Sequence, residues 1–158
     1  MQTAELSDKH PGKFMAADPG YRSYGGKKRF QGAVVTLKLF EDNSLVRKVL
    51  GTPGTGKVLV VDGGGSMRSA LLGDQLAALA VENGWEGVLI YGCIRDSAAI
   101  SEMNLGVMAL GTHPFKTEKR NEGQENLRLR FSGLTIEPGD YLYADEDGIL
   151  LSKELLSL

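Results

Sequence analysis

The chain has 158 residues, of which 42% are hydrophobic, and this size and composition suit one domain with a sizeable buried core. Its 18 basic and 20 acidic residues give a formal net charge of -2, without the basic excess that is typical of proteins binding nucleic acid or anionic lipid. The single cysteine, Cys93, excludes an intrachain disulfide and fits a reducing compartment. We therefore expect a cytoplasmic or organellar protein that binds neither nucleic acid nor a membrane.

The first twenty residues mix charged side chains with glycine and proline and lack an apolar core. Such a segment is neither a signal peptide nor a membrane helix. Terminal segments of this composition are often poorly ordered. We expect a flexible N-terminal arm over residues 1–20 and a single domain over residues 21–158.

The next segment predicts a strand, a short helix and a glycine-rich connection. Residues 33–40 are rich in Val and Leu and predict the strand, and capping residues at positions 42–44 precede a helix over residues 45–50. Residues 51–57 have the spacing of a phosphate-binding P-loop, but Val58 stands where Ser or Thr should hold magnesium. A working P-loop also follows a strand and opens a helix, whereas this one follows a helix and opens a strand, so we do not expect nucleotide binding here.

The middle of the chain predicts a strand, helix and strand crossover unit. Unbroken apolar runs at residues 58–61 and 88–91 are typical of parallel strands that are covered on both faces. Four apolar residues recur between them at helical spacing: Leu72, Leu76, Leu79 and Ala80. The C-terminal ends of two such strands lie on one edge of the sheet, where open α/β sheets bind their ligands.

Polar residues gather at that predicted edge. The turn at residues 63–65 leaves the first strand there, the helix begins at residues 73–76, and Arg95 and Asp96 leave the second strand. Unpaired amides at a helix start can hold a carboxylate, so these pieces make a candidate binding site. The alternative is structural: Asp74 only favours the helix start, and Arg95 and Asp96 form a local ion pair with Asp96 capping the next helix. The residues alone leave both interpretations open.

The remaining third of the chain is rich in strands. We expect a short helix over residues 97–103, an exposed mixed-charge loop over residues 116–120 and a hairpin turn at residues 145–147. Strands are predicted at residues 107–110, 127–131, 134–136, 141–143 and 149–151. The fold class is therefore α/β, with mixed sheets around a central parallel βαβ unit and helices on one side.

From about residue 21 onward the sequence resembles the family of the regulator of ribonuclease E activity A and the 4-hydroxy-4-methyl-2-oxoglutarate aldolases. Seven stretches carry the resemblance: residues 24–26, 40–43, 61–66, 73–76, 92–96, 111–114 and 143–148. The resemblance implies a swivelling β/β/α domain and a homotrimer with sites near subunit boundaries. For the aldolase members it also implies a divalent metal and a small 2-keto acid substrate.

The resemblance assigns roles to the residues at the predicted sheet edge. It implies that Asp96 binds the metal, that Arg95 binds substrate and that Gly73, Asp74, Gln75 and Leu76 bind substrate through the helix start. Mg²⁺ or Mn²⁺ fits, because one carboxylate with several waters can hold such an ion, and the ion would stabilise a pyruvate enolate. Arg95 would offset the developing negative charge, and Asp74 is the candidate for orienting or deprotonating a water that relays the proton.

Two functions follow from the resemblance. The first is a metal-dependent lyase that cleaves 4-hydroxy-4-methyl-2-oxoglutarate to pyruvate and decarboxylates oxaloacetate through the same enolate. Aldolase members commonly carry an acidic residue where this chain has Ala99. The second is a trimeric inhibitor of ribonuclease E-type RNA degradation that binds an endoribonuclease or an RNA helicase through protein surfaces. Members acting in this way can lack the metal-binding aspartate, which is present here as Asp96. A scaffold with a vestigial site is a third possibility.

Overall fold

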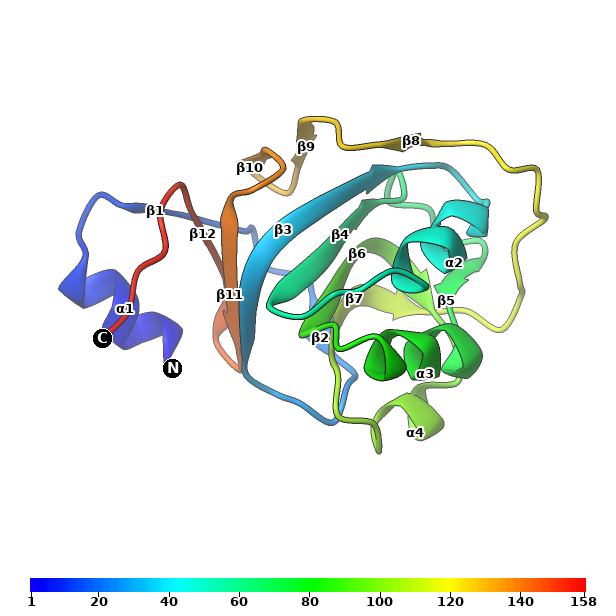
Figure 1. The fold of residues 1–158 in the computed structure, drawn as a ribbon, viewed down its shortest axis with the longest axis horizontal. Coiled ribbons are helices and arrows are strands. Elements are labelled where there is room, and N and C mark those ends of the chain that lie inside the picture. Colours follow the sequence, from blue (N-terminus) through cyan, green and yellow to red (C-terminus); the bar gives the residue numbers. More distant parts are fainter.

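A computed structural model describes residues 1–158 as one large mixed sheet with helices α2, α3 and α4 on one face and α1 at the far end (Figure 1). The elements in chain order are α1 (Thr3–Lys9), β1 (Phe14–Ala16), β2 (Arg22–Ser23), β3 (Phe30–Lys38), α2 (Ser44–Leu50), β4 (Lys57–Asp62), β5 (Ala70–Leu72), α3 (Asp74–Glu82), β6 (Gly87–Ile94), α4 (Ser97–Ile100), β7 (Gly106–Thr112), β8 (Gln124–Glu125), β9 (Leu129–Phe131), β10 (Leu134–Ile136), β11 (Tyr141–Asp145) and β12 (Gly148–Ser152).

The sheet has a parallel centre and antiparallel flanks, which confirms the predicted α/β class. Its strand order is β1-β12-β11-β3-β4-β6-β7-β2, with β5 beside β6 and β8 beside β3. Strands β3, β4, β6 and β7 run parallel to one another, whereas the pairings of β1, β2, β11 and β12 are antiparallel. The hairpin of β9 and β10 forms a separate sheet of two strands.

The central strands are buried on both faces, as their unbroken apolar sequences predict. Leu59 and Val61 of β4 point into a core beneath the helices, which also contains Leu76 of α3. Val58 and Val60 belong to a second core on the opposite face, together with the β9 and β10 hairpin. Period-2 alternation therefore sends successive apolar side chains into two different cores, and the sheet needs hydrophobic residues at every position.

The N-terminal segment differs from the expected flexible arm. It contains helix α1 and strand β1, and β1 pairs with β12. The Thr3 backbone N–H and hydroxyl donate to the Asp145 carboxylate at 2.7 and 2.8 Å, and Leu6 is buried against Tyr143 and Leu150. These contacts compensate for the weak local signal and make the segment part of the domain.

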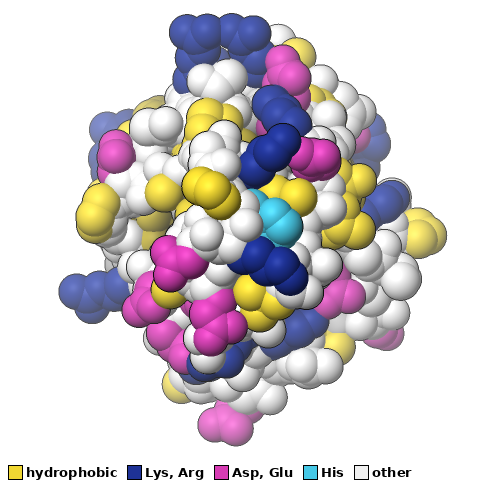
Figure 2. All heavy atoms as spheres, turned by 90° about the vertical axis from the view of Figure 1, so that its left-hand side faces the viewer, with side chains coloured by type: hydrophobic (Ala, Val, Ile, Leu, Met, Phe, Trp, Pro, Cys, Tyr) yellow, Lys and Arg dark blue, Asp and Glu magenta, His cyan; other side chains and the backbone are white.

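The surface at the α1 end carries acidic and basic side chains interspersed with small hydrophobic areas (Figure 2). No continuous basic surface covers this face, in keeping with the formal net charge of -2. None of the helices combines the length and hydropathy that a membrane-spanning helix requires.

The two helices that flank β6 have boundaries different from those predicted. Leu72, assigned from its spacing to the helix, instead ends strand β5, whose three residues are all buried; α3 begins at Asp74. Helix α4 ends at Ile100, earlier than the predicted residue 103. The stretch with P-loop spacing connects α2 to β4, and there a Cβ on Gly54 would lie 2.2 Å from Trp85 Cδ2, so this glycine serves close packing.

Candidate functional site

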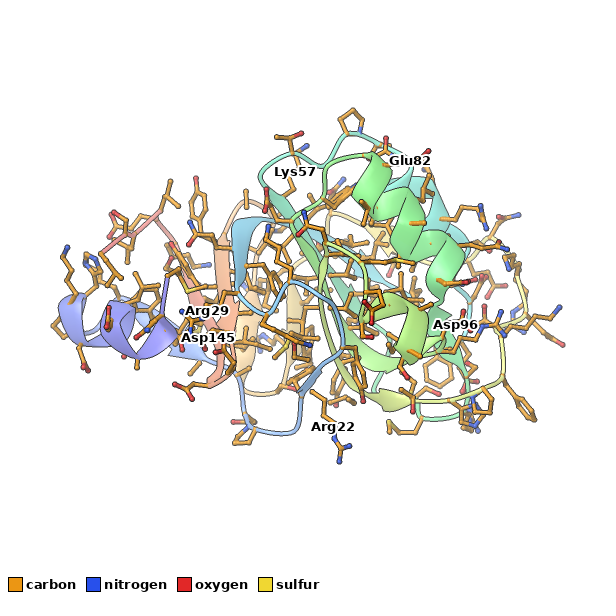
Figure 3. The ribbon with its side chains drawn as sticks, turned by 90° about the horizontal axis from the view of Figure 1, so that it is seen from below. Arg22, Arg29, Lys57, Glu82, Asp96 and Asp145 are labelled. Atoms are coloured by element: carbon orange, nitrogen blue, oxygen red, sulfur yellow. The ribbon has the colours of Figure 1, made fainter.

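A polar cavity of about 140 Å³ lies where α3 begins and β6 ends. Eleven residues line it: Asn43, Arg47, Ala70, Gly73, Asp74, Gln75, Leu76, Arg95, Asp96, Lys116 and Lys119. The structure thus brings together the segments that the topology predicted at one edge of the sheet. Figure 3 shows Asp96 at this edge, well away from Lys57, which begins β4.

The Asp96 carboxylate is oriented by the start of α3. Its Oδ2 atom accepts a hydrogen bond from the Asp74 backbone N–H at 3.0 Å, whereas it makes no side-chain cap of α4. Asp96 and Arg95 form no ion pair, so the predicted structural alternative of a local pair and an α4 cap is wrong. No protein group donates a hydrogen bond to Oδ1, and Asp96 lines the cavity.

The backbone at Asp96 adopts a left-handed conformation, with φ 57° and ψ 40°. Among residues other than glycine, aspartate and asparagine adopt this conformation most readily. The turn comes directly after β6 and brings the carboxylate back to the start of α3. A β-branched or bulky residue at this position would be strained as well as unable to bind the Asp74 amide.

Arg95 lies beside Asp96 and is held through its backbone and its side chain. Its N–H donates to the Leu72 carbonyl of β5 at 2.9 Å, and its Nη1 donates to the Pro114 carbonyl at 3.4 Å. The long second bond leaves most of the guanidinium donors available to a ligand. The guanidinium and the free carboxylate oxygen therefore both line the same cavity.

Glycine is required at position 73 because the side chains of Asp96 and Arg95 lie close to its backbone. A Cβ at this position would lie 2.8 Å from Asp96 Oδ2 and 3.5 Å from Arg95 Nε. We expect Gly73→Ala to displace the Asp96 carboxylate and to lower activity on the order of 100-fold, because small misplacements of reacting groups cost about that much. Steady-state assays beside thermal melts test this expectation. Gly51→Ala is the matched control, since its new methyl meets nothing nearer than 3.3 Å; equal activities of the two variants would contradict the prediction.

Three basic residues of the cavity were not predicted. Arg47 comes from α2, and Lys116 and Lys119 come from the loop that follows β7. The sequence indicated an exposed mixed-charge loop at residues 116–120, since no local pattern shows which surface a loop covers. The available signal was topological: β7 is parallel to β6, so the chain leaving β7 emerges at the same edge.

A buried carboxylate holds this loop in place. Asp42 is only 1% exposed and accepts hydrogen bonds from the backbone and hydroxyl of Ser44 and from the backbone N–H groups of Arg120 and Glu122. Burial alone would raise the pKa of Asp42, but these hydrogen bonds outweigh it and lower the pKa to about 2. Asn43 adds bonds to the Thr117 hydroxyl. The Asp42 carboxylate therefore fixes the loop that carries Lys116 and Lys119.

The glycine turn at residues 63–65 does not line the cavity. Gly64 and Gly65 have φ values of 68° and 72°, and a Cβ at these positions would lie 2.7 Å from the Phe40 ring and 3.0 Å from the Tyr91 ring, respectively. The turn thus serves a tight connection, which was the structural one of its two predicted interpretations.

Comparison with known proteins identifies the family. The RraA-like family model, described as Aldolase/RraA, matches residues 3–151. The chain belongs to the RraA-like family. The matched range begins within α1, in agreement with an N-terminal segment that packs as part of the domain.

Two curated relatives of this RraA-like chain share one name. It is 56% identical over 154 residues to a protein of Laribacter hongkongensis (98% of this chain, 97% of the relative) and 60% identical over 139 residues to one of Dechloromonas aromatica (88% and 85%). Both are named "Putative 4-hydroxy-4-methyl-2-oxoglutarate aldolase".

Two solved structures are similar over nearly the full length. The RNA-processing inhibitor RraA from Thermus thermophilis has a TM-score of 0.95 at 46% identity (99% of this chain, 95% of that chain). A Geobacillus kaustophilus structure named S-adenosylmethionine: 2-dimethylmenaquinone methyltransferase has a TM-score of 0.97 at 49% identity (99% and 97%). Because one fold carries three different names, the function has to be argued from the site.

Proposed function

We propose that this chain is a divalent-metal-dependent lyase that cleaves 4-hydroxy-4-methyl-2-oxoglutarate to pyruvate and decarboxylates oxaloacetate at the same site. The observation that carries the proposal is the Asp96 carboxylate, which lines a polar cavity, with one oxygen bound by the α3 start and the other free of protein hydrogen bonds. Relatives that are 50–60% identical and bear the aldolase name support the same reading.

The residues of the cavity fit Mg²⁺ or Mn²⁺. Mg²⁺ is commonly held by one or two carboxylates and retains several waters. The cavity offers the free Asp96 oxygen and the nearby Asp74 carboxylate, and no group of three or more His, Cys, Asp or Glu side chains forms a closed cage. Asp96 would hold the ion, which when bound supplies a Lewis acid for the keto acid oxygens.

Arg95 and the start of α3 would bind the two ends of the keto acid half of the substrate. The guanidinium fork offers paired donors to a carboxylate or to the oxygen on which negative charge develops. The backbone N–H groups of Gln75 and Leu76 have no intrahelical carbonyl partner, because they lie in the first turn of α3. The nearby Arg47, Lys116 and Lys119 favour a dianionic substrate over a neutral one.

Asp74 is the residue that we propose for proton transfer. Its carboxylate lines the cavity and is exposed, while its backbone N–H holds Asp96. It would take the substrate hydroxyl proton through a water and return a proton to the enolate carbon. Ala99, where aldolase members commonly carry an acid, lies exposed on α4 and offers no group for proton transfer, so we assign the step to Asp74.

Methyl transfer, the activity in the name of the Geobacillus kaustophilus structure, suits this cavity poorly. The methyl donor in that name carries a positive sulfonium, and the cavity walls carry Arg47, Arg95, Lys116 and Lys119. The cavity has only two carboxylates, one of them the proposed metal ligand, so little negative charge is left to balance a sulfonium. A dicarboxylate, by contrast, complements these side chains.

Pyruvate release tests the lyase proposal directly. The purified chain is incubated with oxaloacetate and with 4-hydroxy-4-methyl-2-oxoglutarate, each with Mg²⁺, with Mn²⁺ and with a chelator, and pyruvate is measured by a coupled assay. We expect release that depends on the divalent ion. A protein that is folded and yet inactive on both substrates under every ion would rule out the lyase proposal.

We also propose that the chain assembles as a homotrimer with the cavity near a subunit boundary. The domain exposes large apolar side chains on the segments that follow β3, β4 and β7. They include Phe40, Met67 and Phe115, which are 53, 50 and 69% exposed. Such side chains gain stability when a partner covers them. Light scattering at micromolar concentration should give three times the mass of 17.0 kDa; a monomer mass would argue against a site that is completed at a boundary.

Regulation of RNA degradation is the second candidate, and the similarity to the Thermus thermophilis RNA-processing inhibitor favours it. In this role the chain would bind an endoribonuclease or an RNA helicase through its surface, and the cavity would not take part. Inhibition of a purified ribonuclease E-type enzyme should then survive the Asp96→Asn change, which removes the proposed metal ligand. Inhibition that disappears with pyruvate release would instead connect both roles to the cavity.

A further inference from the structure

Arg95 and Asp96 separate two hollows. On one side lies the polar cavity described above, and on the other lies a second hollow of about 210 Å³. The second hollow is lined by Arg95, Asp96, Thr112, His113 and Pro114. The topology explains this arrangement, because Ile94 at the end of β6 is paired with Thr112 at the end of β7, and the next residues of both strands project from the same edge.

His113 has a fixed position and a fixed tautomer in this hollow. Its backbone N–H donates to the Ile94 carbonyl at 2.9 Å. The Phe115 backbone N–H donates to His113 Nδ1 at 3.1 Å, and the two rings meet edge to face. Since Nδ1 accepts a hydrogen bond, the proton of the neutral ring is on Nε2, and no protein group accepts it. The hollow therefore offers an unused donor from Nε2 and a hydroxyl from Thr112.

The contents of the two hollows differ in a way that matches the two halves of a substrate. The first contains the amides of the α3 start and three basic side chains besides Arg95, which suit the half on which negative charge develops. The second is shallower, has the apolar ring of Pro114 in its wall, and carries hydrogen-bond donors on Thr112 and His113. Such a wall suits a half that is released as a small acid with an apolar substituent.

We infer that a substrate spans the Arg95 and Asp96 pair, with its keto acid half in the first cavity and its departing half in the hollow of Thr112, His113 and Pro114. His113 Nε2–H donates to the carboxylate of the departing half and is a specificity-determining residue. The inference rests on the lyase function proposed above and adds to it the residue that recognises the departing half of the substrate.

The reaction balances within these two hollows. The bond between C3 and C4 of the hydroxy keto acid breaks, its electron pair passes toward the C2 keto oxygen, and the C4 hydroxyl loses its proton. C4 becomes the keto carbon of one pyruvate in the second hollow. C3 takes up a proton and completes the other pyruvate in the first cavity. No oxidant or reductant is needed.

A hydrogen-bond donor in the second hollow should not assist the decarboxylation of oxaloacetate. Its departing group is the C4 carboxylate, which leaves as neutral CO2. A donor to that carboxylate stabilises the charged ground state more than the transition state and so does not assist the reaction. Loss of the His113 donor should therefore impair cleavage of the hydroxy keto acid selectively.

The test compares kcat/KM for both substrates in three variants of the full chain with Mg²⁺. His113→Asn retains an acceptor for the Phe115 N–H but removes the Nε2 donor. It should change the ratio of the two kcat/KM values by roughly 10- to 100-fold in favour of oxaloacetate, mainly through KM for the hydroxy keto acid, as expected for one hydrogen bond to a charged group. His113→Gln, whose amide reaches further, should recover part of that loss. His10→Asn, at the far end of the fold, is the matched control.

Three other outcomes would overturn the inference. Equal losses on both substrates would make His113 a structural residue, and unchanged kcat/KM values would remove it from the site; both results leave the lyase function in place. A wild type that cleaves neither substrate overturns the lyase function and the inference together. Melting temperatures of the three variants identify any loss that results from unfolding.

Discussion

Asp96→Asn should reduce metal-dependent pyruvate release on the order of 1,000-fold or more while leaving the fold intact. Asparagine has nearly the same shape, adopts the left-handed conformation of residue 96 and retains an oxygen for the Asp74 N–H. It removes the negative charge at the free oxygen, which is the only feature we assign to metal binding. Loss of a Lewis acid costs several kcal/mol of transition-state stabilisation, which corresponds to this rate effect.

Arg95→Lys is the informative comparison. Lysine retains the charge but loses the paired donors of the guanidinium, so substrate use should weaken while Mn²⁺ binding, measured by electron paramagnetic resonance, persists. The loss should be smaller than for Asp96→Asn, which should lose the Mn²⁺ signal as well. The two neighbours then separate into a metal ligand and a substrate ligand.

Asp8→Asn, an exposed carboxylate-to-amide change on α1, is the control for altered net charge. An active wild type with an equally active Asp96→Asn variant would falsify the metal assignment. Matching melting temperatures of wild type and Asp96→Asn are needed for either conclusion, and the conservative geometry of the change makes them the expected result.

The sequence predicted the central part of the fold because that part depends on local signals. Residues 58–61 and 88–91 are apolar at every position, and a strand covered on both faces needs this pattern, as β4 and β6 show. Once the crossover is recognised, its parallel strands place Arg95 and Asp96 beside the start of α3 without any further information. Topology and the family resemblance together predict the candidate site.

Features that depend on distant partners could not be predicted in this way. The Asp96 carboxylate caps the helix that begins 22 residues earlier, whereas local reasoning assigned it to the helix that follows. Thr3 is held by Asp145, 142 residues away. The composition of residues 1–20 does not reveal this contact and therefore predicts a flexible arm. Lys116 and Lys119 line the cavity because Asp42, far earlier in the chain, binds their loop. In each case a single buried or helix-capping carboxylate makes the connection.

Asp42→Ala should be the most destabilising single change in the neighbourhood of the site. It removes one buried carboxylate and leaves the N–H groups of Ser44, Arg120 and Glu122 without their acceptor. Buried donors without partners cost about 1–3 kcal/mol each, less where water reaches them, so we expect a loss of about 3 kcal/mol in the free energy of unfolding. The freed loop should also lower pyruvate release, because it carries Lys116 and Lys119.

The pH dependence of this effect has a definite sign. The pKa of Asp42 falls from 3.8 to about 2 on folding, so its charge stabilises the folded state above about pH 4 and ceases to do so as pH falls toward 2. This shift corresponds to about 2 kcal/mol. The difference in unfolding free energy between wild type and Asp42→Ala, measured by urea denaturation, should therefore shrink across that range.

Glu118→Ala, in the same loop with a side chain 86% exposed, should cost less than about 0.5 kcal/mol and show no such trend. A difference for Asp42→Ala that stays constant from pH 6 to pH 2 would show that the carboxylate charge does not hold the loop.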